Sequence, residues 1–266
     1  MTVLLQSAVG SGGDQRRDPL RQPFAAWSIW NLPLSRAARL VPAHMQPMPG
    51  TVVDPEIIIH APDAPLQQVY ANHHAWDGGD RCMTQGPAFA SLPLPPNLTI
   101  PSRNATNPGG LGNGNHVASV LRDDGRTVWQ DLPLSHCEGG NWTASSTDFS
   151  SGDLFAGGQI GAHGGTGMSG LGGSLRLGEL VKRGAPIRHA LAVAPNCPVN
   201  CFACPDAPGT APFRWPAVTG EECLKYQGRV PQLVHGALLA LPPAVDIESL
   251  GLRTEPGRMI AWTMQK

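Results

Sequence analysis

Glycine and proline limit what this chain can fold into more than any other feature. The sequence of 266 residues contains 32 glycines and 27 prolines, together more than a fifth of the chain. Both are unfavourable inside α-helices, because glycine loses backbone entropy there and proline lacks the N–H that a helix requires. An all-helical bundle is therefore excluded. Because 41% of the residues are hydrophobic, the chain has enough apolar side chains for a core, and we expect it to fold.

The charge balance and the length of the apolar runs each exclude one class of partner. The chain has 19 Lys+Arg against 20 Asp+Glu, which gives a formal net charge of -1. A nucleic-acid binder needs a basic face to neutralise phosphates, and these scattered cations do not supply one. No apolar run approaches the roughly 20 residues that span a bilayer. We therefore expect no nucleic-acid partner and no membrane span.

The spacing of the apolar runs predicts an all-β fold. After a polar, glycine-rich stretch over residues 1–22, predicted to be a disordered arm, Pro or Gly interrupts short apolar runs about every eight to twelve residues. We predict one β domain over residues 23–266: an antiparallel, jelly-roll-like sandwich with long Gly/Pro-rich loops and little helix. Strands are expected near Val52–His60, Gln67–Tyr70, His116–Leu121, Thr127–Asp131, Ser174–Val181, Ile187–Val193, Leu233–Leu241 and Arg258–Thr263. A surface loop over Leu92–Gly114 and a short helix over Ala244–Leu250 complete the prediction.

The cysteines and glycosylation sequons favour an oxidising compartment. Six cysteines are present, at Cys82, Cys137, Cys197, Cys201, Cys204 and Cys223, and sequons begin at Asn97, Asn104 and Asn141. Two local disulfides among the last four cysteines are favoured, which leaves Cys82 and Cys137 to pair. The less favoured alternative is a zinc site with those four thiolates as ligands, since Cys201 and Cys204 have zinc-ligand spacing. We therefore expect a secreted protein without a cofactor.

The two ends of the chain predict an incomplete gene product. The first residues, Met1–Ser7, lack the basic region and the long apolar core of a signal peptide. The last residues, Arg258–Lys266, stop inside a predicted strand. We therefore expect that a leader and one or two final strands are missing from this chain.

One predicted hairpin pairs a carboxylate with an imidazole. The runs Ser174–Val181 and Ile187–Val193 both alternate and are five residues apart, so we expect them to pair antiparallel. If Val181 pairs with Ile187, Glu179 lies opposite His189, unless a bulge at Gly178 turns the acid outward. The same face would carry Leu175, Leu177, Leu191 and Val193. An acid and an imidazole on an apolar face need each other, because an unpaired buried charge is costly.

Two more histidines are expected on inner faces. The hairpin His116–Asp131 puts His116 on the face of Asp131, Ala118, Val120 and Trp129, and the run Leu233–Leu241 places His235 inside as well. Inner histidines with neighbouring acids are typical of acid–base catalysis. The catalytic candidates are therefore His116, Asp131, Glu179 and His189. An equally weighted alternative is a set of core histidines with satisfied hydrogen bonds.

A glycine-rich segment and the tryptophans supply the candidates for ligand binding. The segment Gly161–Gly173 contains a literal G-x-G-x-x-G pattern, but no helix pattern follows it, so we reject dinucleotide binding. Its amides would suit an anionic or hydroxyl-rich ligand, with His163 as the polar side chain, although tight winding between strands is the favoured interpretation. Trp76 and Trp142 lie beside polar turns, where indoles stack on sugar rings or simply close the ends of the sandwich.

The chain from Pro23 to Lys266 resembles a group of secreted microbial β proteins rich in Gly, Pro and Trp. The resemblance rests on the stretches PFAAWSIWNLPL, GRTVWQDLPLSHCEGG, GAHGGTGMSGLGGSLRLGEL, IRHALAV, FRWPA and HGALLALPP. In similar proteins the chain continues beyond the position of Trp262, which supports the expectation of a truncated end. The resemblance implies no particular activity, and the cysteines from Cys197 to Cys204 depart from its pattern.

These observations predict an extracellular protein that acts on a polysaccharide, as a lyase or a glycoside hydrolase. A lyase needs a base, for which His116 and His189 are candidates. It also needs a cation against the uronate carboxylate, for which Arg176 and Arg188 are candidates. A hydrolase needs two carboxylates, for which Glu179 and Asp131 are the candidates. The alternative is a non-catalytic glycan-binding or cell-wall matrix protein that binds through its tryptophan-bearing loops.

Overall fold

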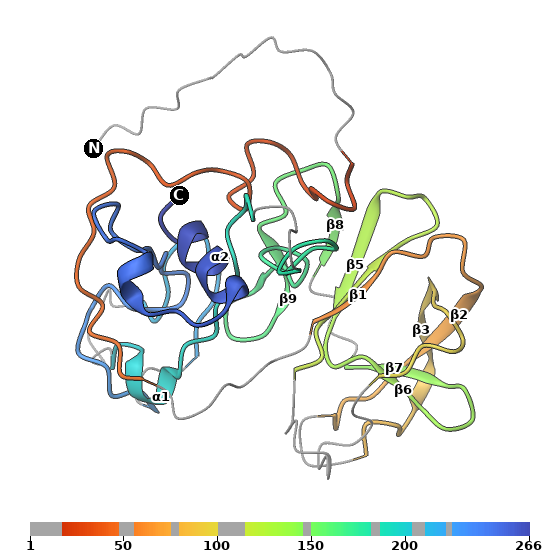
Figure 1. Ribbon diagram of the computed structural model, residues 1–266. Coiled ribbons are helices and arrows are strands. Elements are labelled where there is room, and N and C mark those ends of the chain that lie inside the picture. The colour runs from red at the N-terminus through yellow and green to blue at the C-terminus, as the bar shows by residue number, and fades with distance from the viewer. Residues whose placement is uncertain are drawn as a thin grey trace, which may run out of the picture.

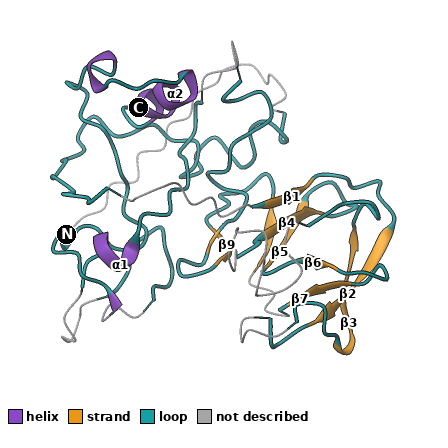
Figure 2. Ribbon diagram, turned by 60° about the horizontal axis from the view of Figure 1, so that its bottom comes forward, coloured by secondary structure: helices purple, strands orange, loops and turns teal. Residues whose placement is uncertain are grey.

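The chain folds into a strand-rich part and a loop-rich part that lie side by side (Figure 1). Within the described residues, every strand falls between residues 57 and 163, and both α-helices follow residue 196. The view in Figure 2, turned by 60°, shows the same separation of strands and helices. The computed structural model describes residues 18–47, 56–75, 80–100, 115–145, 150–181, 187–203, 211–221 and 225–266.

Nine strands and three short helices make up the regular structure of the described residues. The strands are β1 (Ile57–Ile59), β2 (Leu66–Ala71), β3 (Gln85–Pro93), β4 (Ala118–Leu121), β5 (Thr127–Asp131), β6 (Ser135–His136), β7 (Trp142–Ala144), β8 (Ser150–Asp153) and β9 (Ile160–His163). The helices are α1 (Cys197–Asn200), the 3₁₀ helix η2 (Glu248–Leu250) and α2 (Glu255–Thr263). The predicted all-β, sandwich-like fold with little helix is confirmed.

Two four-stranded sheets contain all of these strands except β9. Their orders are β1-β4-β5-β8 and β3-β2-β7-β6. Each sheet has one parallel pair, β1 with β4 and β2 with β7, so the sheets of the sandwich are mixed where antiparallel sheets were predicted. The partners of each parallel pair are far apart in the sequence, which leaves room for the long connection that parallel pairing requires.

The predicted hairpin of β4 and β5 forms, and its strands pair antiparallel. Val120 pairs with Trp129, and both lie on the face that packs against the other sheet. The turn is closed by Asp124, whose Oδ1 accepts hydrogen bonds from the N–H groups of Arg126 at 2.8 Å and Thr127 at 2.7 Å. A short acidic side chain that accepts from the backbone two and three residues ahead is a turn-forming device, which is why this hairpin could be predicted.

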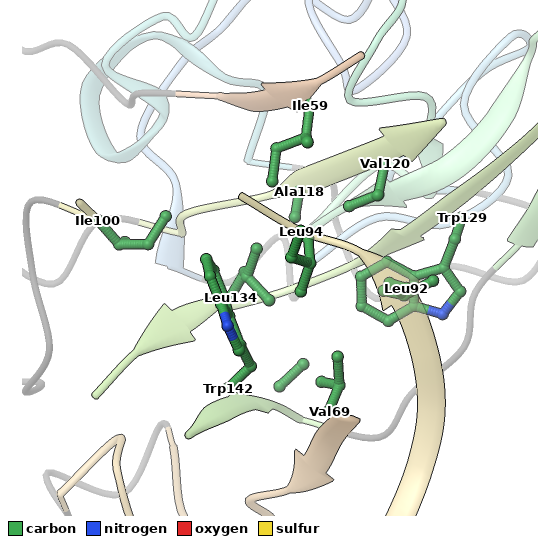
Figure 3. Packing of buried hydrophobic residues seen from close by; sticks show 11 residues of the cluster. Ile59, Val69, Leu92, Leu94, Ile100, Ala118, Val120, Trp129, Leu134 and Trp142 are labelled. Atoms are coloured by element: carbon green, nitrogen blue, oxygen red, sulfur yellow. The ribbon is translucent and has the colours of Figure 1, made fainter. Parts of the chain in front are cut away.

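Apolar side chains between the two sheets form the main core (Figure 3). They are Ile59, Ala118, Val120 and Trp129 from the first sheet, Val69, Leu92, Trp142 and Ala144 from the second, and Leu94, Ile100 and Leu134 from connecting segments. None of these side chains is more than 5% exposed. Full burial of a large apolar side chain contributes about 1.5–3 kcal/mol, so this cluster supplies much of the stability of the strand-rich part.

The two strands predicted over Ser174–Val181 and Ile187–Val193 do not form, and that prediction was wrong. The first segment is a series of turns, because Gly178 has a φ of 88° and Leu180 a φ of 54°. A left-handed residue breaks the pleat on which strand alternation depends. The predicted apolar face is consequently absent, and Leu177 is 91% exposed.

The strands predicted over Leu233–Leu241 and Arg258–Thr263 are also wrong. The first segment consists of irregular backbone and turns, with Gly236 at a φ of 82°. The second belongs to helix α2, whose N-cap is Thr254: its Oγ1 accepts the N–H of Gly257 at 3.2 Å. A threonine followed within two residues by a proline is a helix-start signal, which outweighs the apparent alternation.

The remaining predicted elements agree in part. The run Gln67–Tyr70 lies within β2, and Val52–His60 contains the shorter β1, with residues 52–55 outside the described residues. The predicted helix over Ala244–Leu250 is limited to η2. The predicted loop over Leu92–Gly114 begins at the end of β3, and its residues 101–114 lie outside the described residues. The same holds for residues 1–17 of the predicted arm.

Two disulfides join described cysteines, Cys82–Cys137 and Cys197–Cys201. The first confirms the pair predicted by elimination, and the second is one of the predicted local bridges. Cys204 and Cys223 lie outside the described residues. Two disulfides fit an extracellular protein. Among the described helices, none is long and apolar enough to cross a membrane.

Candidate functional site

An open cleft of about 580 Å³ lies beside the glycine-rich segment, around strand β9. Strand β9 is located where the strand-rich and loop-rich parts meet (Figures 1 and 2). The lining residues are His73, Asn115, Leu132, Ser145, Gly161, Ala162, His163, Gly164, Gly165, Gly167, Thr219 and Glu221. The cleft therefore combines glycine backbone from one segment with polar side chains from several others.

The glycine-rich segment passes close to sheet residues, and this explains its composition. The side chain of Gln130 on β5 is buried, and its Oε1 accepts the N–H of Gly170 at 2.8 Å. A Cβ at Gly161 would lie 2.3 Å from that same Oε1 and 2.5 Å from the Cα of Ser169. No side chain fits at such distances, so glycine is required there. The favoured prediction, that the segment winds tightly, agrees with these contacts.

A histidine–carboxylate pair lies at one side of the cleft. His163, at the end of β9, has its Nε2 3.3 Å from Oε1 of Glu56, which directly precedes β1. Both side chains are partly exposed, at 23% and 19%. An imidazole beside a carboxylate, with access to solvent, is able to take up and release a proton. His163 was predicted as a ligand-binding side chain, and it does line the cleft.

An acidic side chain, Glu221, lines the cleft from the loop-rich part. Oε2 of Glu221 accepts a hydrogen bond from the hydroxyl of Tyr226 at 2.9 Å. Burial raises the pKa of Tyr226 above its ordinary value, and the hydrogen bond to Glu221 and the charge of Glu221 raise it further. The phenol therefore remains protonated and continues to donate to the carboxylate. Glu221 is exposed and held in one orientation.

Glu179 and His189 meet as predicted, although the hairpin that was expected to join them does not form. Nε2 of His189 lies 3.1 Å from both carboxylate oxygens of Glu179, and its Nδ1 lies 2.8 Å from the carbonyl oxygen of Ala190. A turn holds the Glu179 carboxylate in this position, because the N–H of Arg176 donates a hydrogen bond to its Oε2 at 2.8 Å. The His189 side chain is fully buried, and the pair does not line the cleft. Because it is buried away from the cleft, the pair fits a structural role and not a catalytic one.

The other two catalytic candidates are buried as well. His116 and Asp131 are both 0% exposed. His116 has a φ of 45° and precedes β4, so it does not share the alternation that was predicted to put it on the face of Asp131. Oδ1 of Asp131 accepts hydrogen bonds from Oγ of Ser145 at 3.1 Å and from the N–H of Leu132. Because Ser145 and Leu132 line the cleft, Asp131 lies directly behind its wall.

Two predicted ligand-binding residues have structural contacts instead. Trp142 is 1% exposed and stacks on His136 with ring centroids 4.0 Å apart, so the expected exposed platform is wrong for this residue. Nη1 of Arg176 donates to the carbonyl oxygen of Arg21 at 2.9 Å. Neither arginine candidate lines the cleft, although Arg188 is exposed.

Of the predicted glycan acceptors and the remaining tryptophan candidate, only two asparagines lie within the described residues. Asn97 and Asn141 are exposed, as a glycan acceptor must be. Trp76 and Asn104 lie outside the described residues. Glycosylation at these asparagines stays a prediction.

Sequence reasoning did not select Glu56 or Glu221 for the site, and it noted Trp215 only as one of several tryptophans beside polar or Pro-rich turns. The two acids belong to no motif, so no pattern distinguishes them from ordinary surface charges. Trp215 is 68% exposed, and its Nε1 donates to Oε1 of Gln159 at 3.3 Å, two residues before the cleft residue Gly161. Its place in the proline-rich stretch FRWPA was a usable signal for an exposed indole.

The lining of the cleft favours an uncharged, hydroxyl-rich ligand. Amide, hydroxyl, imidazole and carboxylate groups line it, and among the described lining residues there is no Lys or Arg to neutralise a phosphate or uronate. No known protein family, no curated protein and no solved structure matches the chain. The function is therefore inferred from the geometry of the cleft.

Proposed function

We propose that this protein is an extracellular glycan-binding protein that holds a neutral sugar chain in the cleft beside the glycine-rich segment. The lining of that cleft is the main support: glycine backbone lets a ligand approach closely, while Asn115, Ser145, Thr219 and Glu221 offer the hydrogen-bonding groups that sugar hydroxyls need. The absence of cations among the described lining residues argues against a uronate chain and so against a lyase.

Trp215 extends this proposed binding surface. Its exposed indole is tied to Gln159, so the ring keeps a defined orientation beside the cleft. Sugar rings pack their C–H faces on such indoles, and a rigid aromatic surface loses little entropy on binding. The two disulfides and the exposed sequon residues Asn97 and Asn141 suit an extracellular setting, where polysaccharides are found.

Glycoside hydrolysis is the second candidate, and the partly exposed Glu56–His163 pair favours it. In a hydrolase, one acid protonates the glycosidic oxygen and a second group takes a proton from the attacking water. Glu221, held by Tyr226, and the Glu56–His163 pair would fill these two roles. His163 and Glu221 line the cleft, in contrast to the buried Glu179–His189 pair.

Affinity electrophoresis in gels that contain soluble polysaccharides tests the binding proposal. The panel contains neutral β-glucans and xylans, and the uronate chains pectate and alginate. We expect retardation by at least one neutral chain and none by the uronates. Trp215→Ala and Glu221→Gln should each weaken retention about tenfold, which corresponds to the loss of one good contact. Trp27→Ala is the matched control, because Trp27 is 67% exposed and does not line the cleft.

Two outcomes would overturn the proposal: retention of no neutral chain, or equal loss of retention in the Trp215→Ala and Trp27→Ala variants. An assay for new reducing ends on the retained chain separates binding from hydrolysis. If the protein is a hydrolase, His163→Asn and Glu221→Gln abolish new reducing ends. If it only binds, no reducing ends appear with the wild-type protein.

A further inference from the structure

Two cysteines and a histidine come together in the loop-rich part, at a place that the proposed glycan site does not use. The Sγ atoms of Cys197 and Cys201 and a ring nitrogen of His235 all lie within 4.8 Å of one another. Sγ of Cys197 is 3.7 Å from Nε2 of His235. In a tetrahedral zinc site, a thiolate sulfur and an imidazole nitrogen are about 3.6 Å apart, as follows from the usual zinc–sulfur and zinc–nitrogen bond lengths. The C-x3-C spacing of the cysteines also falls within the range of zinc ligands.

The hydrogen bonds of His235 prepare its Nε2 to act as a metal ligand. Nδ1 lies 2.8 Å from the carbonyl oxygen of Gly165, which can only accept, so Nδ1 carries the proton and Nε2 has the lone pair. The hydroxyl of Tyr226 is 3.3 Å from Nε2, but its single proton goes to Glu221. A backbone carbonyl that fixes the tautomer of a histidine is the usual outer partner of a metal-bound imidazole.

The backbone around this group is also fixed. The N–H of Arg214 donates to the carbonyl oxygen of His235 at 2.8 Å, and the short helix α1 begins at Cys197 and has Cys201 as its C-cap. Cys201 is 2% exposed, and Cys197 and His235 are partly buried. The three donors therefore come from two segments that already lie together before any ion binds.

We infer that Cys197, Cys201 and Nε2 of His235 form a Zn²⁺ site in the reduced protein, and that the Cys197–Cys201 disulfide closes this site in the oxidised protein. A dithiol reductant passes two electrons and two protons to the disulfide and becomes a disulfide itself, which leaves two thiols on the protein. Zinc then binds both sulfurs as thiolates and His235 as a neutral imidazole, and two protons are released. Water completes the tetrahedron.

The ion would stabilise the wall of the cleft. Nδ1 of His235 is hydrogen-bonded to the carbonyl oxygen of Gly165. The hydroxyl of Tyr226 lies between Nε2 of the same histidine and the carboxylate of Glu221. Gly165 and Glu221 both line the cleft. The site stands independently of the proposed glycan function, because zinc affinity can be measured without any sugar. This differs from the four-thiolate site considered from the sequence, because a histidine takes the place of Cys204 and Cys223.

Zinc titration of the full chain before and after reduction tests the inference. The disulfides are reduced with a water-soluble phosphine, which does not compete for zinc as a thiol would. We expect one equivalent of Zn²⁺ to bind to the reduced protein and none to this site in the oxidised protein. Cys197→Ser and His235→Gln should each raise the zinc Kd about a hundredfold or more, since even outer partners of a metal site are worth 10–100-fold. His74→Gln, an exposed histidine elsewhere, is the matched control and should leave the Kd unchanged.

Cobalt supplies a readout that needs no variant to fold. Co²⁺ added to the reduced wild-type protein should give thiolate-to-cobalt charge-transfer absorption in the near ultraviolet and intense visible bands of a tetrahedral ion. Tyr226→Phe retains all three ligands and should retain both signals. The inference is overturned if the reduced protein binds no zinc, or if it binds zinc equally well after Cys197→Ser and His235→Gln. A cobalt spectrum without thiolate bands would overturn it too.

Discussion

The strand-rich and loop-rich parts are held together by different interactions. In the strand-rich part, eleven buried apolar residues pack between two sheets. In the loop-rich part, several large apolar residues remain exposed, among them Leu177 at 91% and Leu238 at 70%. Its segments are joined by polar contacts such as the Glu179–His189 pair, by glycines that allow close approach, and by a smaller apolar cluster in which Phe24, Trp30 and Leu171 pack against Leu121, Val128 and Leu154. At Gly172, for example, a Cβ would lie 2.1 Å from an atom of the Trp30 ring.

This difference explains where the function is expected. A sheet core tolerates few polar groups, whereas irregular backbone presents amides and side chains to a ligand. The proposed cleft therefore lies at the junction, with Gln130 of β5 supporting the glycine-rich segment from the sheet side. The loop-rich part contributes Thr219 and Glu221 to the lining of the cleft.

The largest expected difference between the two parts concerns tryptophan. Trp142→Ala removes a buried ring from the core and should lower the free energy of unfolding by about 3–5 kcal/mol. Trp27→Ala removes a ring that is 67% exposed and should cost less than about 1 kcal/mol. Urea unfolding followed by circular dichroism measures both. Equal losses would mean that the sheets do not dominate stability.

The two disulfides should also differ in what they contribute. In the chain-entropy account, stabilisation grows with the length of the closed loop. Cys82–Cys137 spans 55 residues and is expected to contribute roughly 4 kcal/mol. Cys197–Cys201 spans four residues and is expected to contribute roughly 2 kcal/mol. Paired Cys→Ser variants, each unfolded in urea without reductant, compare them. A larger loss for the short bridge would contradict this order.

The buried pair of the loop-rich part is expected to have a smaller effect. Glu179→Gln removes the charged acceptor of His189 and should lower the free energy of unfolding by about 2 kcal/mol, the usual value for a hydrogen bond to a charged group. Glu248→Gln, at an exposed acid, is the matched control. If Glu179 were a catalytic group instead, its substitution would reduce activity on a glycan and leave stability intact.

The strand-rich part could be predicted from the sequence better than the loop-rich part. The β4–β5 hairpin was predictable because an Asp-Gly turn separates two strand-like runs, and the side chains that alternate onto the inner face, such as Val120 and Trp129, are apolar. The loop-rich part has the same apparent alternation, but left-handed residues such as Leu180 break it, and their φ values are not visible in a pattern of apolar residues. The Glu179–His189 contact was thus predicted correctly from an incorrect hairpin.

The candidate site was less predictable than the fold. Its acids, Glu56 and Glu221, are 165 positions apart in the sequence, and neither belongs to a motif. Only the folded chain brings Glu221 into one cleft with His163, and Glu56 into contact with His163. The glycines were the one visible signal, because their density already indicated a backbone that approaches something closely.

The smallest expected effect is at the turn of the strand-rich part, where it depends on pH. Hydrogen bonds from the side chain and backbone of Thr127 and from the backbone of Arg126 lower the pKa of Asp124 to about 2. A depressed acid pKa stabilises the folded protein above the pKa of the unfolded chain, about 4, and this contribution is lost as the pH falls toward 2. Asp124→Asn should therefore be less stable than the wild type at pH 6, and the difference should shrink between pH 4 and pH 2. Urea midpoints across this range measure it, with the adjacent Asp123→Asn as control, because no hydrogen bond to the Asp123 side chain closes the turn. A difference that stays constant down to pH 2 would show that the charge of Asp124 does not stabilise the hairpin.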